Sequence, residues 1–385
     1  MKVVFVSNYL NHHQLPLSLS MLKIPEIEYK FISTIPTPDF RLEIGYPDMN
    51  HEYDFVVCSY DDAQSCKKAL ELCEDADVLI VGSAPDMFYK TRLKSQKLTF
   101  RWSERIYKIK PPFYQMPLRA LKYFWQNGRY RNLYMLCASA YTAADYAKTF
   151  TFLNKTYKWG YFPEVKKYDN IDTVINKKQK NTLLWAGRFI DWKHPEIAVE
   201  IAKRLKEDGY SFTLNIIGTG DMESELKTLI SDYGLEDCVY MLGSMSPEKV
   251  REYMENSQIY LFTSDRQEGW GAVLNESMNS GCAVVASSAI GSVPFLLTNG
   301  DNGYIYRDGN IDDMYSKVEN LLDNPEKAKE FGKKAYKTLC DEWNAENAAK
   351  RFVCLAKAKL NGNKKSDVFD NGVCSKAEIL NDGWI

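Results

Sequence analysis

The chain has 385 residues, of which 45% are hydrophobic and 26% charged, and its formal net charge is −2. These values are typical of a globular protein of about two domains, and the small net charge gives no support to a nucleic-acid-binding protein. No stretch approaches about 18 apolar residues, which argues against membrane-spanning helices. The chain has nine cysteines and no Cys-x-x-Cys pair, which favours free thiols over disulfides or zinc. The N-terminus lacks the long apolar core of a signal peptide, in keeping with a reducing cytosol.

The first part of the chain alternates short apolar runs with helix-like segments. A helix is predicted over residues 14–23, directly after the first run. Strands are predicted over residues 2–7, 29–34, 54–59, 76–83, 133–139 and 157–162. Apolar runs of this length between turn residues are the expected form of buried strands.

The alternation is more regular beyond residue 180. Strands are predicted over residues 181–187, 211–218, 238–243, 259–264 and 282–287. Between the first two, Pro195 opens a helix with Ile197, Ile201 and Leu205 on one face, and Gly209 follows its end. Strands that are apolar throughout and joined by helices indicate a parallel sheet covered on both faces.

Two such blocks predict an α/β fold with two Rossmann-like parallel-sheet domains facing an interdomain cleft. The expected divisions are an N-terminal domain over residues 1–165, a polar linker over 166–181, a C-terminal domain over 182–345, and a helix and polar tail over 346–385. The helix could cross back to the first domain. In open parallel sheets the ligand lies beyond the carboxyl ends of the strands. Two facing sheets would therefore bring two substrates together.

The first candidate binding residues follow the strand at 181–187. Gly187 and Arg188 end that strand, and Lys193 comes five residues later, just before a helix. An arginine fork and a mobile lysine ammonium over the strand ends suit a diphosphate. The alternative is that both are solvated cations that flank a helix.

The second candidate group follows the strand at 211–218. Gly218 and Gly220 begin a pattern like the dinucleotide-binding fingerprint, but Glu223 stands where its third glycine belongs. This argues against NAD binding, and hence against a nicotinamide oxidoreductase. A tight turn near a ligand remains a valid interpretation.

The third group is the stretch EGWGAVLNE, residues 268–276. Gly269 and Gly271 let backbone amides approach an anion, and the helix that follows adds free N–H groups and its positive dipole end. Carboxylates accept hydrogen bonds from sugar hydroxyls, so Glu276 could bind a ribose and Glu268 a transferred hexose. The alternative is two surface glutamates on a helix.

Three segments together resemble one enzyme family. EGWGAVLNE is similar to the Glu-x7-Glu signature of the retaining GT-B glycosyltransferases of family 4. AGRFIDWKHP, residues 186–195, resembles that family's Gly-Arg…Lys diphosphate loop, and SSAIGSVPFLLTNGDNGYIY, residues 287–306, resembles its Gly-Gly-x-x-Glu and Asn-Gly segment. The resemblance covers about residues 180–355 and extends to the N-terminal half in architecture only.

The resemblance implies a nucleoside-diphosphate sugar held mainly by the C-terminal domain. Arg188 and Lys193 would contact its phosphates, Glu276 its ribose, and Glu268 its hexose. The predicted donor-binding residues are Gly187, Arg188, Lys193, Gly218, Gly243, Glu268, Gly269, Trp270, Gly271 and Glu276, and the predicted catalytic residues are Glu268, Arg188, Lys193 and His13. Such enzymes generally need no metal or other cofactor, and the sequence has no Asp-x-Asp flanked as a metal site would require.

Two departures from the family pattern stand out. The N-terminal loop, SNYLNHHQLPL, lacks the usual glycines, and Phe295 replaces the usual glutamate after Gly-Gly-x-Pro. We therefore expect altered contacts in the N-terminal domain and a local difference beside the donor pocket.

The acceptor side is predicted from the loop after the first strand. His12 and His13 are adjacent there, and because neighbouring residues point in different directions, at most one would face the substrate. A neutral imidazole could hydrogen-bond the reacting hydroxyl or the phosphate. The alternative is a histidine that caps the next helix. The predicted acceptor-side residues are Asn8, His12, His13 and Arg101.

Residues 90–131 combine twelve Lys or Arg with a single acid, Glu104, and many aromatic residues. This mixture suits an anionic membrane surface or a bound lipid diphosphate. A solvated basic face with core aromatics is the alternative, and nothing else supports nucleic-acid binding.

The sequence thus predicts a cytoplasmic enzyme, with attachment to the inner membrane face as a further expectation, and the resemblance implies that the enzyme retains configuration. It would move a hexose from a nucleoside-diphosphate sugar to a saccharide acceptor, for which a lipid-linked saccharide is favoured, in polysaccharide or glycoconjugate assembly. The alternatives are a GT-B sugar-nucleotide epimerase and a non-catalytic nucleotide-sugar-binding partner subunit.

Overall fold

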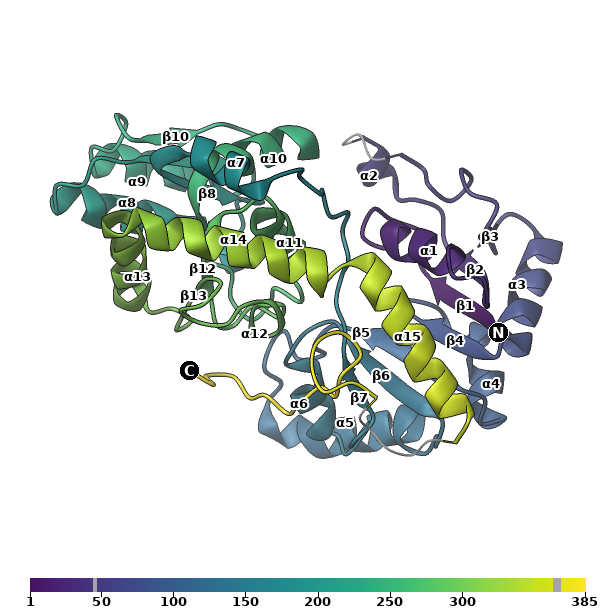
Figure 1. Ribbon diagram of the computed structural model, residues 1–385. Helices are drawn as coiled ribbons and strands as arrows, with labels where there is room; N and C mark the ends of the chain where they lie inside the picture. The colour runs from purple at the N-terminus through teal and green to yellow at the C-terminus, as the bar shows by residue number, and fades with distance from the viewer. Residues whose placement is uncertain (44–46, 363–367) are drawn as a thin grey trace. The chain divides into compact units, whose positions relative to one another are not determined.

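The computed structural model describes residues 1–43, 47–362 and 368–385 (Figure 1). The chain folds into two compact units. Unit 1 comprises residues 1–164 and 344–380, and unit 2 comprises residues 165–343 and 381–385. Residues 166–181, expected to form a linker, lie in unit 2 and include the helix α7 (Ile171–Lys177).

Within the described residues, unit 1 is built on a parallel sheet of seven strands in the order β3-β2-β1-β4-β5-β6-β7. The strands are β1 (Lys2–Ser7), β2 (Glu28–Ser33), β3 (Val56–Cys58), β4 (Val78–Val81), β5 (Thr99–Ser103), β6 (Leu133–Cys137) and β7 (Thr156–Lys158). The helices are α1 (Leu15–Leu22), α2 (Asp39–Glu43), α3 (Ala63–Asp75), α4 (Lys90–Lys94), α5 (Met116–Tyr123), α6 (Thr142–Ala147) and α15 (Ala345–Leu360), with short turns η1 (Asp86–Phe88), η2 (Phe113–Gln115) and η3 (Phe124–Gly128). The central strands are buried on both faces, as the apolar runs predict.

Strand β5 is absent from the predicted strands, because its residues fall within the basic aromatic stretch 90–131. Its Phe100 and Trp102 side chains are buried in the core. Arg92 is also buried, and its guanidinium donates hydrogen bonds to backbone carbonyls, among them that of Ala76 at 2.6 Å. The stretch 90–131 is therefore partly core, and only its later part can form a surface.

Helix α15 completes the core of unit 1. Its Phe352 ring packs against Phe100 and Trp159, with ring centroids 5.1 and 5.8 Å apart. The helix also packs along α1. A segment distant in sequence thus covers one face of the first sheet.

Unit 2 contains, among the described residues, a parallel sheet of six strands in the order β10-β9-β8-β11-β12-β13. The strands are β8 (Gln179–Ala186), β9 (Thr213–Ile217), β10 (Val239–Met241), β11 (Ser257–Phe262), β12 (Ala283–Ser287) and β13 (Tyr304–Tyr306). The helices, besides α7, are η4 (Asp191–Lys193), α8 (Pro195–Glu207), α9 (Glu223–Asp232), α10 (Pro247–Asn256), α11 (Ala272–Asn279), α12 (Val293–Leu296), α13 (Ile311–Asp323) and α14 (Pro325–Asp341).

Helix α8 shows how the local sequence sets these elements. Pro195 occupies its first turn, where a missing N–H is harmless, and Ile197, Ile201 and Leu205 form its buried face. Gly209, with φ of 79°, ends the segment in the left-handed conformation that glycine tolerates.

Residues 368–385 belong to the polar tail, for which no element is predicted, and they make tertiary contacts. The backbone of Cys374 donates to Lys158 O and that of Lys158 to Ser375 O, both at 2.8 Å. The tail thereby pairs antiparallel with β7 and satisfies the backbone groups of an edge strand. Its last five residues belong to unit 2.

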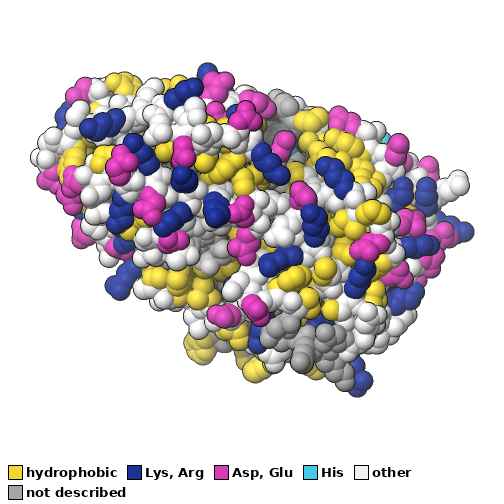
Figure 2. Space-filling model, viewed as in Figure 1, with side chains coloured by type: hydrophobic (Ala, Val, Ile, Leu, Met, Phe, Trp, Pro, Cys, Tyr) yellow, Lys and Arg dark blue, Asp and Glu magenta, His cyan; other side chains and the backbone are white. Residues whose placement is uncertain are grey.

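The surface carries both signs of charge. Figure 2 shows acidic and basic side chains interspersed on the face viewed, in keeping with the small net charge. Among the described residues, no helix is both long enough and apolar enough to cross a bilayer.

Candidate active site

Lys193 and Glu268 meet at the point where the strand order of unit 2 reverses. β8 and β11 are neighbours, and the chain proceeds outward from β8 to β9 and from β11 to β12. The loops that follow these two strands bound the crevice where open α/β sheets bind ligands. Across it, Lys193 Nζ donates to Glu268 Oε2 at 2.6 Å, and the side chains are only 15% and 12% exposed. The pair is therefore shielded from the solvent that weakens surface ion pairs.

Buried hydrogen bonds hold the backbones of these two loops together. Trp185 Nε1 donates to Thr263 Oγ1 at 2.8 Å, and Thr263 Oγ1 donates to the carbonyl of Lys193 at 2.7 Å. The backbone N–H of Asp265 donates to the carbonyl of Trp192 at 3.0 Å. The position of Lys193 is thus set by the core.

Arg188 lies on the same loop as Lys193 and is exposed. The Trp192 ring contacts both cations: Arg188 Cζ lies 6.0 Å and Lys193 Nζ 4.9 Å from its centroid. The loop therefore presents two positive charges around one indole.

Gly218 and Gly220 are required by packing between the loops. A Cβ on Gly218 would lie 1.8 Å from the carbonyl oxygen of Gly187, and one on Gly220 would lie 2.4 Å from that of Phe189. The backbone N–H of Gly218 donates to the carbonyl of Gly243 at 2.9 Å. These contacts explain why both positions are glycine, so the glycine pair does not indicate a bound dinucleotide.

The amino end of α11 begins at Gly271, whose φ is 84°. A Cβ there would lie 2.5 Å from the Phe262 ring, so only glycine fits. The Trp270 side chain is 1% exposed and its Nε1 donates to Asn275 Oδ1 at 2.9 Å. Trp270 can therefore offer a ligand only its backbone, and its indole packs near Phe295, with centroids 6.3 Å apart.

Glu276 lies on α11 in a desolvated setting. Burial raises its pKa from 4.5 to about 7, against an opposing effect of the Arg251 guanidinium. Burial, and then the carboxylates of Glu276 and Glu268, raise the pKa of Tyr260. The charges of both carboxylates thus reach the same buried side chain, Tyr260 of β11. Its hydroxyl donates a hydrogen bond to the carbonyl of Ala186 at 3.0 Å.

Two further segments also brace this site: residues 287–306, which resemble a family segment, and the tail, to which the sequence analysis assigned no role. The backbone of Gly291, after β12, donates to the carbonyl of Glu268 at 3.2 Å. From the tail, Asp382 pairs with Arg266 at 3.4 Å, and Trp384 Nε1 donates to the carbonyl of Ser288 at 3.3 Å. In the sequence of the tail, only the apolar side chain of Trp384 indicates that the tail packs against this site.

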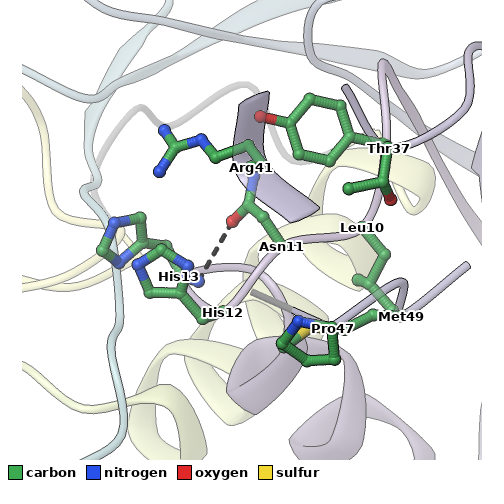
Figure 3. A pocket seen from close by; sticks show the side chains of 9 residues that line it. Leu10, Asn11, His12, His13, Thr37, Arg41, Pro47 and Met49 are labelled. Carbon is green, nitrogen blue, oxygen red and sulfur yellow. Dashed lines mark hydrogen bonds between the residues drawn. The ribbon is translucent and has the colours of Figure 1, made fainter. Parts of the chain in front are cut away.

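The acceptor-side histidines line a small hollow of unit 1, with a volume of about 50 Å³, that is open to solvent (Figure 3). It is formed by the loop after β1 and by residues that follow β2, the strand beside β1 in the sheet. Arg41 of α2, which sequence reasoning missed, also lines it.

The two histidine rings lie together, with centroids 3.8 Å apart. The expectation that they point in different directions is wrong, because residues 12–14 form a turn and not an extended segment. Burial, then the neighbouring His12 and then Arg41, lower the pKa of His13 to about 3. Burial and then Arg41 lower the pKa of His12 to about 4. Both imidazoles are therefore neutral at pH 7.

The other two acceptor-side residues lie in separate contacts. Arg101 Nη1 donates to the Tyr89 hydroxyl at 3.3 Å, and neither residue lines the hollow at His13. Asn8 follows β1, and its carbonyl accepts from the backbone of Thr34 at 2.7 Å. The structure thus groups His12 with His13 and Arg41, and places Arg101 elsewhere in unit 1.

The segment that contains Lys193 and Glu268 matches a known protein family. Residues 167–338 match the glycosyl transferases group 1 family. This group 1 segment includes every donor-side residue named above. The chain is similar to the amylovoran biosynthesis glycosyltransferase AmsK of Erwinia amylovora, with 34% identity over 33% of this chain and 32% of the relative. It is also similar to a Staphylococcus aureus poly(ribitol-phosphate) alpha-N-acetylglucosaminyltransferase, with 27% identity over 44% of this chain and 34% of the relative.

The chain spans about a third to a half of the length of these and other curated relatives. Solved structures match over nearly its whole length. Anabaena Alr3699/HepE in complex with UDP has a TM-score of 0.69 at 12% identity, covering 93% of this chain and 100% of that one. The lipopolysaccharide outer core galactosyltransferase WaaB has a TM-score of 0.66 at 19% identity, with the same coverage. Together with the two parallel sheets, these likenesses establish the GT-B fold.

Proposed function

We propose that this protein is a retaining glycosyltransferase. It moves a hexose from a nucleoside-diphosphate sugar to a saccharide acceptor, lipid-linked, in polysaccharide or glycoconjugate assembly. The observation that carries the proposal is the shielded Lys193–Glu268 pair at the strand-order reversal of the group 1 segment. The names of two relatives, an amylovoran biosynthesis glycosyltransferase and a poly(ribitol-phosphate) alpha-N-acetylglucosaminyltransferase, support the same reaction class.

In this proposal the diphosphate is bound by Lys193, Arg188 and the amino end of α11. The three lie in loops that follow the neighbouring strands β8 and β11. Diphosphate binding would draw the Lys193 ammonium from Glu268, whose carboxylate is then available to a hexose hydroxyl. Glu276, as a carboxylate, accepts from the ribose hydroxyls.

The chemistry needs charge stabilisation more than a protein nucleophile. The bond from the sugar carbon to the diphosphate breaks, and negative charge grows on the phosphate oxygens that face Lys193 and Arg188. Removal of one such positioned donor typically raises the barrier by about 2.7–4 kcal/mol. The acceptor hydroxyl attacks from the leaving-group side, which retains configuration, and its proton passes to the departing phosphate. No metal takes part in this step.

Unit 1 supplies the acceptor side. The neutral imidazole pair of His12 and His13, beside the Arg41 cation, suits a hydroxylated ligand with an anionic group. His13 is assigned to hydrogen-bond the reacting hydroxyl or the phosphate.

Part of the stretch 90–131 forms a surface that we assign to membrane contact. This α5 surface consists of the exposed apolar side chains of Ile109, Phe113, Tyr114, Leu118, Leu121, Phe124 and Trp125, with the cations Lys110, Lys122 and Arg129. Phe113 is 87% and Leu118 73% exposed.

The arrangement of the α5 surface favours lipid. Leu118 and Leu121 lie three residues apart on α5, as do neighbours on one helix face. Tyr114 and Trp125 lie on the short helical segments that flank it. Cations beside an apolar face bind anionic headgroups while the apolar side chains enter the acyl boundary. Attachment at the inner face of a membrane would bring the enzyme to a lipid-linked acceptor.

The decisive experiment is a panel of nucleoside-diphosphate sugars, tested first by thermal shift and then by product analysis. Stabilisation follows from binding to the native state alone. We expect one donor to stabilise the protein and to lose its sugar only when acceptor is present, with retained configuration. An isomerised sugar nucleotide without acceptor would instead identify an epimerase. Donor binding without turnover on any acceptor would identify a partner subunit.

A further inference from the structure

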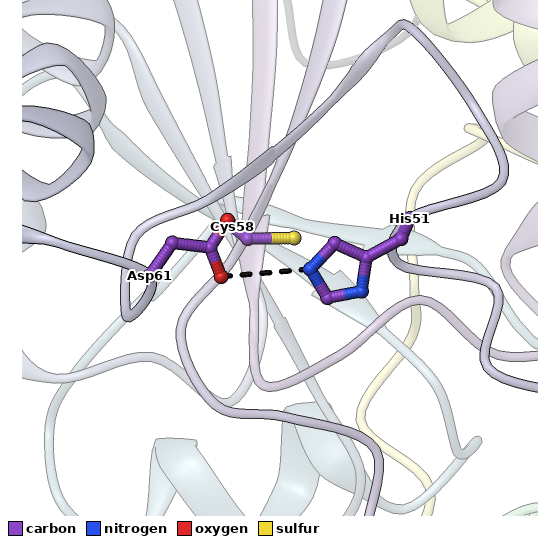
Figure 4. A group of neighbouring side chains, drawn as sticks. All are labelled: His51, Cys58 and Asp61. Carbon is purple, nitrogen blue, oxygen red and sulfur yellow. Dashed lines mark ion pairs between the residues drawn. The ribbon is translucent and has the colours of Figure 1, made fainter.

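Three side chains with metal-binding atoms meet at the end of β3 in unit 1, and none takes part in the proposed reaction. Cys58 is the last residue of β3, and His51 and Asp61 lie in the loops on either side of that strand. A ring nitrogen of His51, the sulfur of Cys58 and a carboxylate oxygen of Asp61 all lie within 4.8 Å of one another. Figure 4 shows the Cys58 sulfur between the Asp61 carboxylate and the His51 ring.

The His51 ring is held in the orientation that a metal ligand needs. Its Nδ1 lies 3.1 Å from Asp48 Oδ2, which leaves Nε2 facing Asp61 Oδ1 at 3.5 Å. Asp48 is itself fixed, since it accepts from Thr37 Oγ1 at 2.7 Å and from the backbone of Asn50 at 3.2 Å. A carboxylate that binds the remote nitrogen of a ligating histidine is a recurrent feature of metal sites.

Ion pairing alone accounts for only part of this group. Attraction to Asp48 and Asp61 explains the position of the imidazole, but it gives no reason for a buried thiol beside the pair. The Cys58 sulfur lies 3.6 Å from the carbonyl of Asn50 and shares a hydrogen bond with the Tyr60 side chain, and neither contact is an ion pair. Nitrogen, sulfur and oxygen donors converging on one point are the ligand set of zinc.

We propose that His51 Nε2, Cys58 Sγ and Asp61 bind one divalent transition-metal cation of the zinc class, with water as the fourth ligand. Around such an ion the donor atoms lie roughly 3–4 Å apart, so only small shifts of the side chains are needed. His51 and Asp61 are 57% and 41% exposed, which gives the ion access from solvent, while Cys58 anchors it to the strand. On binding, the thiol proton of Cys58 passes to water, and no electron is transferred.

The ion would cross-link the loops around β3. Thr37, the partner of Asp48, lines the hollow that contains His13. Metal binding would therefore stiffen one wall of that hollow. This inference is independent of the proposed transfer reaction.

Cobalt titration of the full chain, purified without a polyhistidine tag and stripped with a chelator, tests the proposal. We expect one Co²⁺ per chain, with a thiolate-to-cobalt band in the near ultraviolet that Zn²⁺ abolishes by competition. Cys58→Ser should remove the band, and Asp61→Asn should weaken binding. Asp48→Asn should weaken it about 10–100-fold, because it removes the group that orients His51.

Cys66→Ser is the matched control, since Cys66 is a partly exposed thiol on α3 outside the cluster. It should keep the wild-type titration. The proposal is overturned if the wild-type protein gives no thiolate band, or if Cys58→Ser and Cys66→Ser bind Co²⁺ equally well. Retained binding in Asp61→Asn together with loss in Cys66→Ser would likewise overturn it.

Discussion

The Nζ atom of Lys193 lies 2.6 Å from Oε2 of Glu268, although 75 residues of chain separate them. The contact joins the loop after β8 to the loop after β11 and places a cation and an acid at the same carboxyl edge of the second sheet. A diphosphate and the sugar attached to it need these two kinds of group side by side. The first prediction tests that pairing.

Lys193→Ala is expected to lower turnover at saturating donor by about 10²–10³-fold, with a smaller change in donor affinity. The reason is that the ammonium contributes most when charge develops on the departing diphosphate. Steady-state kinetics and calorimetric binding of the nucleoside diphosphate separate the two quantities. Lys180→Ala, an exposed lysine near the opposite end of β8, is the control and should leave both unchanged. Wild-type turnover in Lys193→Ala would refute the assigned role.

Glu276→Gln is expected to flatten the dependence of stability on pH. Because burial raises the pKa of Glu276 from 4.5 to about 7, the native state binds the proton more tightly than the unfolded state. The contribution of Glu276 to the free energy of unfolding should therefore be greatest below pH 4.5. It should fall between pH 4.5 and 7 and stay low above pH 7. Denaturant unfolding at pH 8 should find Glu276→Gln more stable than wild type by roughly 1–3 kcal/mol.

The same variant should bind the donor less well, since an amide cannot replace a carboxylate that accepts from two ribose hydroxyls. Greater stability with weaker binding is the signature of a residue kept for function. Asp232→Asn, at the exposed end of α9, serves as the control for a lost carboxylate. A pH profile of Glu276→Gln that parallels wild type would contradict the desolvated setting.

Gly218→Ala should destabilise unit 2 by about 3 kcal/mol, whereas Gly243→Ala should cost about 1–2 kcal/mol. Both glycines have positive φ, 144° and 71°, but only at Gly218 would a Cβ meet backbone, 1.8 Å from Gly187 O. Thermal unfolding of the two variants measures the difference. Equal losses would show that the loops after β8 and β9 are not packed as closely as the structure has them.

The α5 surface should carry the attachment to membranes. Leu118→Ser combined with Trp125→Ser is expected to weaken binding to vesicles that contain anionic lipid by at least about tenfold, because apolar area is lost. Binding should also weaken with added salt, since the cations are screened. Co-sedimentation with anionic and zwitterionic vesicles measures both effects. Ile379→Ser, another exposed apolar side chain of unit 1, should bind as wild type does.

The order of strands and helices follows closely from apolar runs and turn residues. The ends of α8, from Pro195 to the glycine after it, are where the punctuation predicts them. Strand β5 was missed because Arg101 and its neighbouring cations obscure the run, and the pairing of Cys374 with β7 was missed because the tail is polar. Burial of a charged or polar segment depends on partners that a local pattern does not contain.

By itself the sequence determined the two alternating blocks and the residues that follow each strand, because strand period, proline and glycine act over a few neighbouring residues. Only the tertiary structure decided that Lys193 meets Glu268, that the rings of His12 and His13 lie together, and that His51 gathers with Cys58. It also decided that Phe100 is buried while Phe113 is exposed, although both belong to one basic aromatic stretch. Such contacts depend on strand order and on the path of each loop, which arise when distant parts of the chain pack into one core.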